Sequence, residues 1–249
     1  MGVFSTAVKS GDTFTTHQGF TLEVVEYIRC NKILVRFQDT GGAEKFVAMK
    51  ELLSGSIKNP YHPSKLNVGF YGVGPYLSRK DGHITKEYMH WSSMFTRCYD
   101  PAYHARFPTY QTKYVDNQWH NYQEFGEWCQ WQVGFGKGVL DKDLLLKGND
   151  AYSPETCVFI PSELNSLIVT QDTKGKTTPA GISYQTSHKR YLVSCAVKGK
   201  NKNLGRYKCP EEAFAVYKDF KENLVRSKAE EYKDQIDIRA YAALSSFTI

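Results

Sequence analysis

Two aspartates and one asparagine in a short stretch have the residue types and spacing of a small metal site. Asp141 and Asp143 follow a glycine-rich approach, and Asn165 comes after a Pro-Glu turn and an apolar run, in the segment LDKDLLLKGNDAYSPETCVFIPSELNSL over 140–167. Carboxylate and amide oxygens are hard ligands that suit Mg²⁺ or Mn²⁺. Because a hairpin followed by a helix can bring such residues together, the stretch predicts one divalent-ion site.

The same stretch resembles the ββα core of HNH nucleases, in the divergent form found in phage homing endonucleases. In that family an Asp-His pair ends the first strand and an Asn lies on the following helix. The resemblance implies that Asp141 and Asn165 hold the metal ion, and it places Lys142 where the general-base His would stand. A lysine acts as a base at neutral pH only when its pKa is depressed by several units. The implied catalytic residues are Asp141, Lys142, Asp143 and Asn165.

Each of these residues also has an ordinary structural interpretation. Asp141 and Asp143 are typical of turns at strand ends, and Asn165 is typical of a helix cap after Pro161-Ser162. Lys142 is equally suited to contact a phosphate. Asn149, next to Gly148, is expected to shape a turn. Further candidates for the missing base are His83, His90, His104 and His120.

The segments before this stretch predict a β module and an aromatic-rich helical region. Over residues 1–60, alternating apolar residues separated by turn signals predict a small SH3-like or Tudor-like β-barrel. Over 61–168 we expect the HNH-like nuclease core, with a first helix that begins after Thr85 and stops at Asp100-Pro101. A second helix is predicted to pack an aromatic face, with a base-stacking platform as the alternative. Its aromatic residues are Trp119, Tyr122, Phe125, Trp128 and Trp131.

The polar segment VTQDTKGKTTP predicts a linker over 169–179, and a different module follows over 180–249. Three short strands are expected there, then a helix with Pro210 in its first turn, and finally a terminal helix. The predicted apolar stripe of the first helix is Ala213, Tyr217, Phe220 and Leu224. The order of GISY, LGRY and CPEEAFAVY resembles the Apetala-type (ethylene-response-factor) DNA-binding domain, which phage homing endonucleases often carry behind an HNH core.

Basic residues are concentrated in this last module. Between Gln171 and Lys233 there are fourteen Lys or Arg and seven Asp or Glu, whereas the whole chain has a net charge of +6. We therefore expect one surface of the sheet to follow the phosphate backbone of double-stranded DNA, with a solvated basic face as the alternative. The predicted contact residues are Lys189, Arg190, Lys198, Lys200, Lys202, Arg206 and Lys208.

Length and composition limit the class of protein. A chain of 249 residues with 41% hydrophobic and 23% charged residues predicts a folded protein of several domains and excludes a mainly disordered one. The strands and helices expected along it make the predicted fold class α+β. The six cysteines form no CxxC pair, so they predict reduced thiols without zinc. No apolar run approaches the roughly 20 residues that a membrane helix needs, and we expect a cytoplasmic protein, in the host cell if a phage encodes it.

Three functions are consistent with these observations. The first is a phage-type HNH homing endonuclease, which hydrolyses a DNA phosphodiester with one Mg²⁺ or Mn²⁺ ion and binds its target through the C-terminal module. The second is a DNA-binding protein that keeps this scaffold without cutting, which Lys142 favours. The third is a phage protein that binds and modulates a host protein, which the unassigned β module and the many aromatic residues favour.

Overall fold

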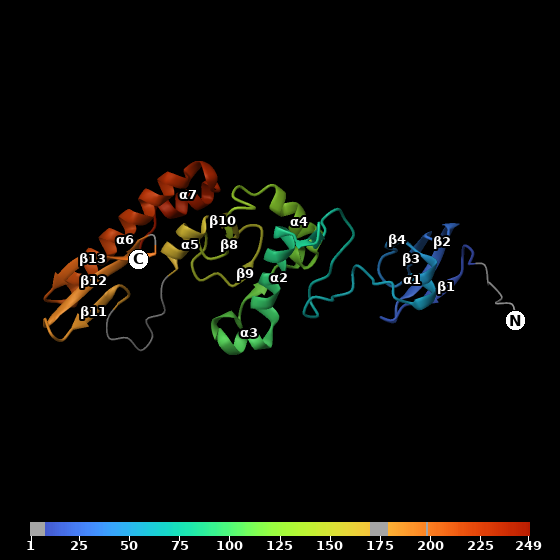
Figure 1. The fold of residues 1–249 in the computed structure, drawn as a ribbon, viewed down its shortest axis with the longest axis horizontal. Helices are drawn as coiled ribbons and strands as arrows, with labels where there is room; N and C mark the ends of the chain where they lie inside the picture. The colour runs from blue at the N-terminus through green and yellow to red at the C-terminus, as the bar shows by residue number, and fades with distance from the viewer. Residues whose placement is uncertain (1–7, 170–178, 198) are drawn as a thin grey trace. The chain divides into compact units, whose positions relative to one another are not determined.

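The computed structural model describes residues 8–169, 179–197 and 199–249 (Figure 1). Within these ranges the fold is a mixed α+β arrangement with several sheets and seven α-helices, and the predicted α+β class is confirmed. The predicted linker over 169–179 lies outside the described residues except at its two ends, and so does Lys198. Over the described ranges, no helix has the length and apolar character that crossing a membrane requires.

The chain forms two compact units, each of which we describe by itself. Unit 1 runs to Arg106 and includes Asn117–Gly126, and unit 2 comprises Phe107–Asp116 and Glu127–Ile249. The β-module belongs to unit 1, whereas the segment with Asp141 and the whole C-terminal module belong to unit 2.

The N-terminal module is an antiparallel sheet with strands in sequence order. The strands are β1 (Thr13–Thr15), β2 (Thr21–Arg29), β3 (Lys32–Phe37) and β4 (Glu44–Val47). Among the described residues β1 pairs only with β2, and β4 pairs only with β3. The predicted barrel is therefore wrong: within the described residues the sheet is open, with β1 and β4 at its two edges.

One face of this sheet carries the core of the module. The buried side chains are Leu22, Val24, Ile33, Val35, Phe37 and Val47, with Leu52 and Ile57 from the segment that follows. Helix α1 (Met49–Ser54) closes this core and ends at Gly55, whose φ of +68° is in the left-handed region that glycine adopts without strain. The alternation of apolar residues that predicted these strands is thus confirmed.

The aromatic-rich region of unit 1 is built around helix α2 (Lys86–Tyr99). The Thr85 side chain accepts a hydrogen bond from the Tyr88 amide, which confirms the predicted cap. The Trp91 indole donates to the Trp119 carbonyl at 2.8 Å, and Trp91 also packs against Tyr122. A basic hairpin precedes α2, formed by β5 (Arg79–Lys80) and β6 (His83–Ile84), and α3 (Pro101–Arg106) follows it.

The second predicted helix begins later than expected. Trp119 lies in the 3-10 helix Asn117–His120, and α4 (Tyr122–Gln130) follows. Trp119, Tyr122 and Phe125 are fully buried, so the packed aromatic face is confirmed for them, whereas Trp131 is 80% exposed just beyond α4.

Unit 2 contains a hairpin followed by a helix at the place where the sequence predicted it. Strand β8 (Val139–Asp141) pairs antiparallel with β10 (Val158–Ile160), and α5 (Ser162–Ile168) comes directly after β10. The chain between the two strands includes β9 (Ala151–Tyr152), which pairs in parallel with β7 (Tyr114–Val115). Val158, Ile160 and Leu164 from this unit form one buried cluster with residues of the last two helices.

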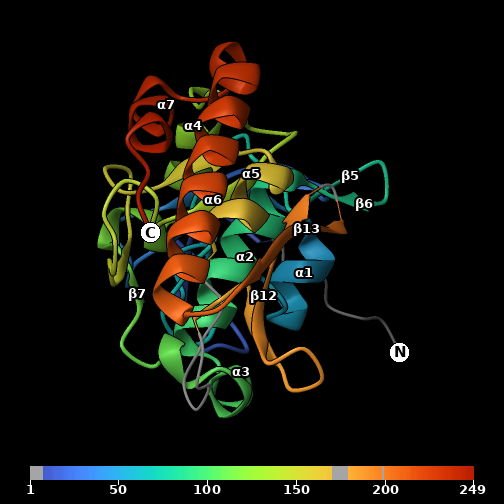
Figure 2. The ribbon, with the colours of Figure 1, turned by 90° about the vertical axis from the view of Figure 1, so that its left-hand side faces the viewer.

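The C-terminal module is an antiparallel sheet covered by a long helix (Figure 2). The sheet consists of β11 (Ile182–Gln185), β12 (Arg190–Val197) and β13 (Lys200–Tyr207), and α6 (Pro210–Tyr232) follows. Ala213 and Tyr217, in the first half of α6, pack on the sheet with Val193, which confirms the predicted stripe.

The second half of α6 belongs to the hairpin core. Val225 and Ala229 pack against Leu164 of α5, and the Lys228 ammonium lies 3.1 Å from Glu163 Oε1. After a 3-10 turn (Lys233–Gln235), the predicted terminal helix is α7 (Ile238–Ser245), and its Ala240 and Leu244 are buried in the same cluster. One helix thus joins the sheet to the core that holds Asp141 and Asn165.

Candidate metal site and nucleic-acid interface

Asp141 lies at the end of β8 and holds the turn that follows. It pairs with Val158 of β10, and its Oδ1 accepts hydrogen bonds from the amides of Asp143 at 2.9 Å and Leu144 at 2.7 Å. Burial raises the pKa of this carboxyl above its usual range, although the two amides act in the opposite direction. The turn interpretation is therefore confirmed for Asp141, and its Oδ2 is left for other contacts.

Lys142 points into the protein and stabilises the same loop. Its side chain is only 4% exposed, and its ammonium donates at 2.6 Å to Asp143 Oδ1 and at 2.6 Å to the Asn149 carbonyl. This arrangement gives Lys142 a role in holding the loop.

Asn149 closes the loop, as its sequence context predicted. Its buried side chain donates to the Lys142 carbonyl at 2.9 Å and to the Ala151 carbonyl, and it accepts from the Ala151 amide at 3.0 Å. The segment from Asp141 to Asn149 is consequently fixed at both ends by hydrogen bonds from buried polar groups.

Asn165, the fourth residue of α5, has a different environment. The helix begins after Pro161, so the alternative role of Asn165 as the cap at the start of the helix is wrong. Its Oδ1 is buried and has no hydrogen-bond partner among the described residues. A buried acceptor without a donor costs about 1–3 kcal/mol, which makes it unusual unless a ligand completes it.

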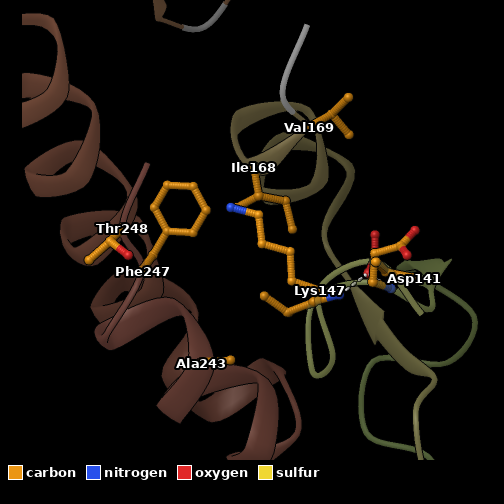
Figure 3. A pocket seen from close by; sticks show the side chains of 10 residues that line it. Asp141, Lys147, Ile168, Val169, Ala243, Phe247 and Thr248 are labelled. Carbon is orange, nitrogen blue, oxygen red and sulfur yellow. Dashed lines mark hydrogen bonds between the residues drawn. The ribbon is translucent and has the colours of Figure 1, made fainter. Parts of the chain in front are cut away.

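Asp141 and Asn165 line two neighbouring cavities of the same core. Asp141 lines a cavity of about 340 Å³ (Figure 3). Asn165 lines one of about 550 Å³, and Ile168 and Phe247 line both cavities. Among the described residues, no group of three His, Cys, Asp or Glu side chains is arranged to hold a metal ion. Carboxylate and amide oxygens are donor types that suit Mg²⁺ or Mn²⁺. Asp141 and Asn165 line different cavities, so the structure does not bring the two predicted ligands into one cavity.

The four histidines considered as substitute bases all belong to unit 1. His104 Nε2 lies 2.9 Å from the Arg97 carbonyl, and the His120 ring packs against Phe95. Burial, followed by the charges of Arg97 and Lys86, lowers the pKa of His90. His83 lies exposed on β6. Asp141, by contrast, lies in unit 2.

The register of the C-terminal sheet separates its basic residues onto two faces. Arg206 lies opposite Leu192 and Ser183, and Arg190 lies opposite Gln185, so both arginines are on the face turned away from α6. Lys202 lies opposite the buried Cys195, and its ammonium is 4.8 Å from the ring of Phe220 on α6. The prediction that all the basic residues share one surface is therefore wrong for Lys202.

A β-bulge causes this separation. Val193 pairs with Gly205 while Ser194 pairs with Asn203, so Leu204 is an extra residue on β13. The extra residue reverses the alternation between faces, and Gly205 adopts a φ of +121° there. By the same register Lys200, opposite Val197, shares the face of Lys202. Lys189, with a φ of +49°, lies in the turn before β12, and Lys208 is exposed just after β13.

The face turned away from α6 combines arginines with amide and small side chains. Arg206 Nε donates to Gln185 Oε1 at 2.8 Å across the sheet. The same face carries Ser183, Arg190, Leu192, Ser194, Ala196, Asn201 and Asn203. Arginine and amide groups are the side chains that read base edges in DNA, and small residues let a sheet approach a groove closely. We call this set, with Gln185 and Arg206, the outer face.

Sequence reasoning did not identify two features of these sites. Lys147 lines the cavity beside Asp141, but its position in the loop carries no motif. The only sequence signal for the bulge at Leu204 is the glycine that follows it. Comparisons with protein-family models, with curated proteins and with solved structures found no match to this chain.

Proposed function

We propose that this protein is an HNH-type endonuclease of the phage homing-endonuclease kind, which binds double-stranded DNA through the outer face and cuts it at the hairpin core. The observation that carries the proposal is the unpartnered, buried Oδ1 of Asn165 in the core that also holds Asp141. The strand order of β8, β10 and α5 supports it, because it is the order that the HNH resemblance implies.

The C-terminal sheet supports the binding half of the proposal. The outer face offers two arginines in a neutral surrounding, and Lys189 and Lys208 extend the positive charge beyond its ends. Such a surface attracts the phosphate backbone, and its amide groups are able to distinguish bases in the major groove. The sheet and helix order agrees with the Apetala-type resemblance.

In the proposed cleavage reaction, the residues of the hairpin core have distinct tasks. When bound, Mg²⁺ or Mn²⁺ would stabilise the charge that develops on the phosphate and the leaving oxygen. Asp141 and Asn165 would hold the ion, while Lys142 and Asn149 keep the loop rigid. No described side chain next to Asp141 is assigned as the base, so the proton of the attacking water would pass to solvent.

Asn165→Leu is the most informative test. Removing a buried polar atom that has no partner is expected to leave stability unchanged or to raise it by about 1 kcal/mol. If Asn165 binds the ion, the same change abolishes nicking of supercoiled DNA in Mg²⁺ or Mn²⁺ while DNA affinity stays within about twofold. A variant that is destabilised, or one that nicks normally, would show that Asn165 is not a ligand.

Asp141→Asn is the matched variant for the other ligand. The amide keeps an oxygen that accepts the two backbone hydrogen bonds, so the turn is expected to remain. It removes the negative charge, and nicking is expected to fall by about a thousandfold or more because the ion is lost. Activity that survives this change would place the metal elsewhere.

A DNA-binding protein that does not cut is the second candidate, and the buried Lys142 favours it. Lys142 fills the position of the general base and donates two hydrogen bonds. If the wild-type protein binds DNA but nicks none with Mg²⁺ or Mn²⁺, this candidate replaces the first one. The outer face would then carry the whole function.

The third candidate, a binder of a host protein, is favoured by apolar side chains on the N-terminal sheet. Tyr27, Ile28 and Phe46 are each more than two-fifths exposed. A pull-down from host lysate with the wild type and with a Tyr27→Ser, Phe46→Ser variant tests it. Capture of the same host protein by both variants would argue against this surface.

A further inference from the structure

We infer that the cavity beside Asp141 is a phosphate-binding subsite, in which Lys147 contacts the phosphate of a nucleotide next to the cleavage position. The inference rests on the proposed function and adds a residue and a ligand class to it. Lys147 lines this cavity together with Asp141, Leu144, Ile168 and Phe247. Figure 3 shows its side chain extending away from the loop toward the Phe247 ring.

The loop that carries Lys147 is held rigidly. Gly148 adopts a φ of +77°, and the Asn149 amide donates to the Leu146 carbonyl at 3.1 Å, so a tight turn surrounds Lys147. The hydrogen bonds of Asp141 and Asn149 fix the two ends of the loop. The fixed loop places the Lys147 backbone beside the cavity, so binding an anion needs only the Lys147 side chain to become ordered.

The charges around the cavity leave the Lys147 ammonium available. It forms no hydrogen bond or ion pair with any described residue. Asp143 Oδ1 is already bonded to Lys142, and Asp141 Oδ1 is bonded to two amides. Lys147 is the only cationic side chain among the described residues that line this cavity. An ammonium with three unused donors suits the oxygens of a phosphate.

The shape and the apolar wall of the cavity indicate a nucleotide. Its volume of about 340 Å³ is at the lower end of the range for small-molecule sites. Ile168, Ala243 and Phe247 form an apolar wall against which a deoxyribose or a base can pack. The Asp141 carboxylate repels a phosphate in the same cavity unless a cation lies between them, so binding should require a divalent ion.

Calorimetric titration of the full-length protein with thymidine 3′,5′-bisphosphate tests the inference. With Mg²⁺ present we expect binding by the wild type, at least tenfold weaker binding by Lys147→Gln, and partial recovery in Lys147→Arg. Lys137→Gln is the matched control, because Lys137 is an exposed lysine of unit 2 that lines a different cavity; its affinity should stay within about twofold. Chelation of the Mg²⁺ should weaken wild-type binding.

The outcomes separate this inference from the proposed function. Equal affinities of the wild type and Lys147→Gln, or no binding by the wild type, would overturn the phosphate subsite. If the bisphosphate binds through Lys147 while no DNA is nicked, the subsite stands and the nuclease proposal fails. If DNA is nicked equally fast at saturating concentrations by the wild type and Lys147→Gln, and their bisphosphate affinities agree, the nuclease proposal stands and the subsite fails.

Discussion

The N-terminal and C-terminal sheets are both antiparallel and both bury one face, but they surround their arginines with different neighbours. On the exposed face of the N-terminal sheet, Arg36 lies between Glu23 and Glu44, and its guanidinium is 2.7 Å from Glu44 Oε1. On the outer face of the C-terminal sheet, Arg206 donates its side-chain hydrogen bond to the neutral amide of Gln185, two strands away on β11. The charge of Arg36 is neutralised locally, whereas the charge of Arg206 is not.

The charge of the partner residue distinguishes a solvated face from a binding face. A surface ion pair contributes only about 0–1 kcal/mol to stability, but it cancels the field that a phosphate would sense. An amide partner orients the guanidinium equally well and leaves its charge in place. Counting basic residues does not reveal this distinction, whereas the identity of each arginine's side-chain partner does.

The largest expected effect comes from reversing the charges of the outer face. Arg190→Glu combined with Arg206→Glu should weaken binding to duplex DNA by about a thousandfold, or about 4 kcal/mol, because two attractive contacts become repulsive. Fluorescence anisotropy with a labelled duplex measures the affinity. The slope of log affinity against log salt concentration is negative, and its magnitude should fall by about two because two phosphate contacts are lost.

Arg36→Glu is the control from the other sheet. Arg36 is already paired with Glu44, so its reversal should leave DNA affinity within about twofold. If Arg36→Glu weakens binding as strongly as the double variant, the contrast between the two sheets is not what selects the DNA-binding face.

A pair of glycine substitutions separates the packing of the two sheets. Gly181 has a φ of +78°, and a Cβ there would overlap the ring of Tyr217 on α6, so Gly181→Ala should destabilise the C-terminal module by about 3 kcal/mol. Gly19 has a φ of +85° with open space around it, so Gly19→Ala should cost only about 1 kcal/mol, from backbone strain alone.

Hydrogen exchange gives a local measure of both effects. The Ser194 amide donates to the Gly181 carbonyl at 2.9 Å, so its protection reports directly on the C-terminal sheet. Equal losses of protection in the two sheets would mean that α6 moves to accommodate the methyl group, and that the helix is not packed closely at Gly181.

Exchanging the partner residues is a smaller but sharper change. Gln185→Glu converts the Arg206 pair into an ion pair like that of Arg36, and should weaken DNA binding by about tenfold, or about 1.4 kcal/mol. The reciprocal Glu44→Gln should leave DNA affinity unchanged, because the N-terminal sheet offers no second arginine next to Arg36. An unchanged affinity in Gln185→Glu would contradict the role assigned to the neutral partner.

Much of the local fold could be predicted from apolar residues that recur every two residues in strands and every three to four residues in helices. The strands around Leu22 and Val35, the Thr85 cap, and the stripe from Ala213 to Leu224 on α6 all follow from short-range periodicity. The open form of the N-terminal sheet could not be predicted, because it depends on the pairing of strand edges that are distant in sequence.

The candidate site was predicted less completely, for a related reason. The orientation of Lys142 depends on Asn149, and the missing partner of Asn165 depends on how α5 packs, so neither follows from spacing. The outer face depends on one extra residue, Leu204, which reverses every side chain before it on β13. Strict alternation of side chains along β13 would place Lys202 and Arg206 on the same face, but the bulge puts them on opposite faces.

That separation leads to the smallest expected effect. Lys202→Ala should change DNA affinity by no more than about twofold, because its ammonium lies 4.8 Å from the Phe220 ring on the α6 side of the sheet and away from the outer face. The loss of this cation–π contact should lower the free energy of unfolding by about 0.5–1 kcal/mol. Anisotropy and denaturant unfolding measure the two quantities on the same sample. If Lys202→Ala instead weakens binding about as much as a single Arg206→Ala, DNA reaches both faces of β13, and the bulge does not divide a binding surface from a structural one.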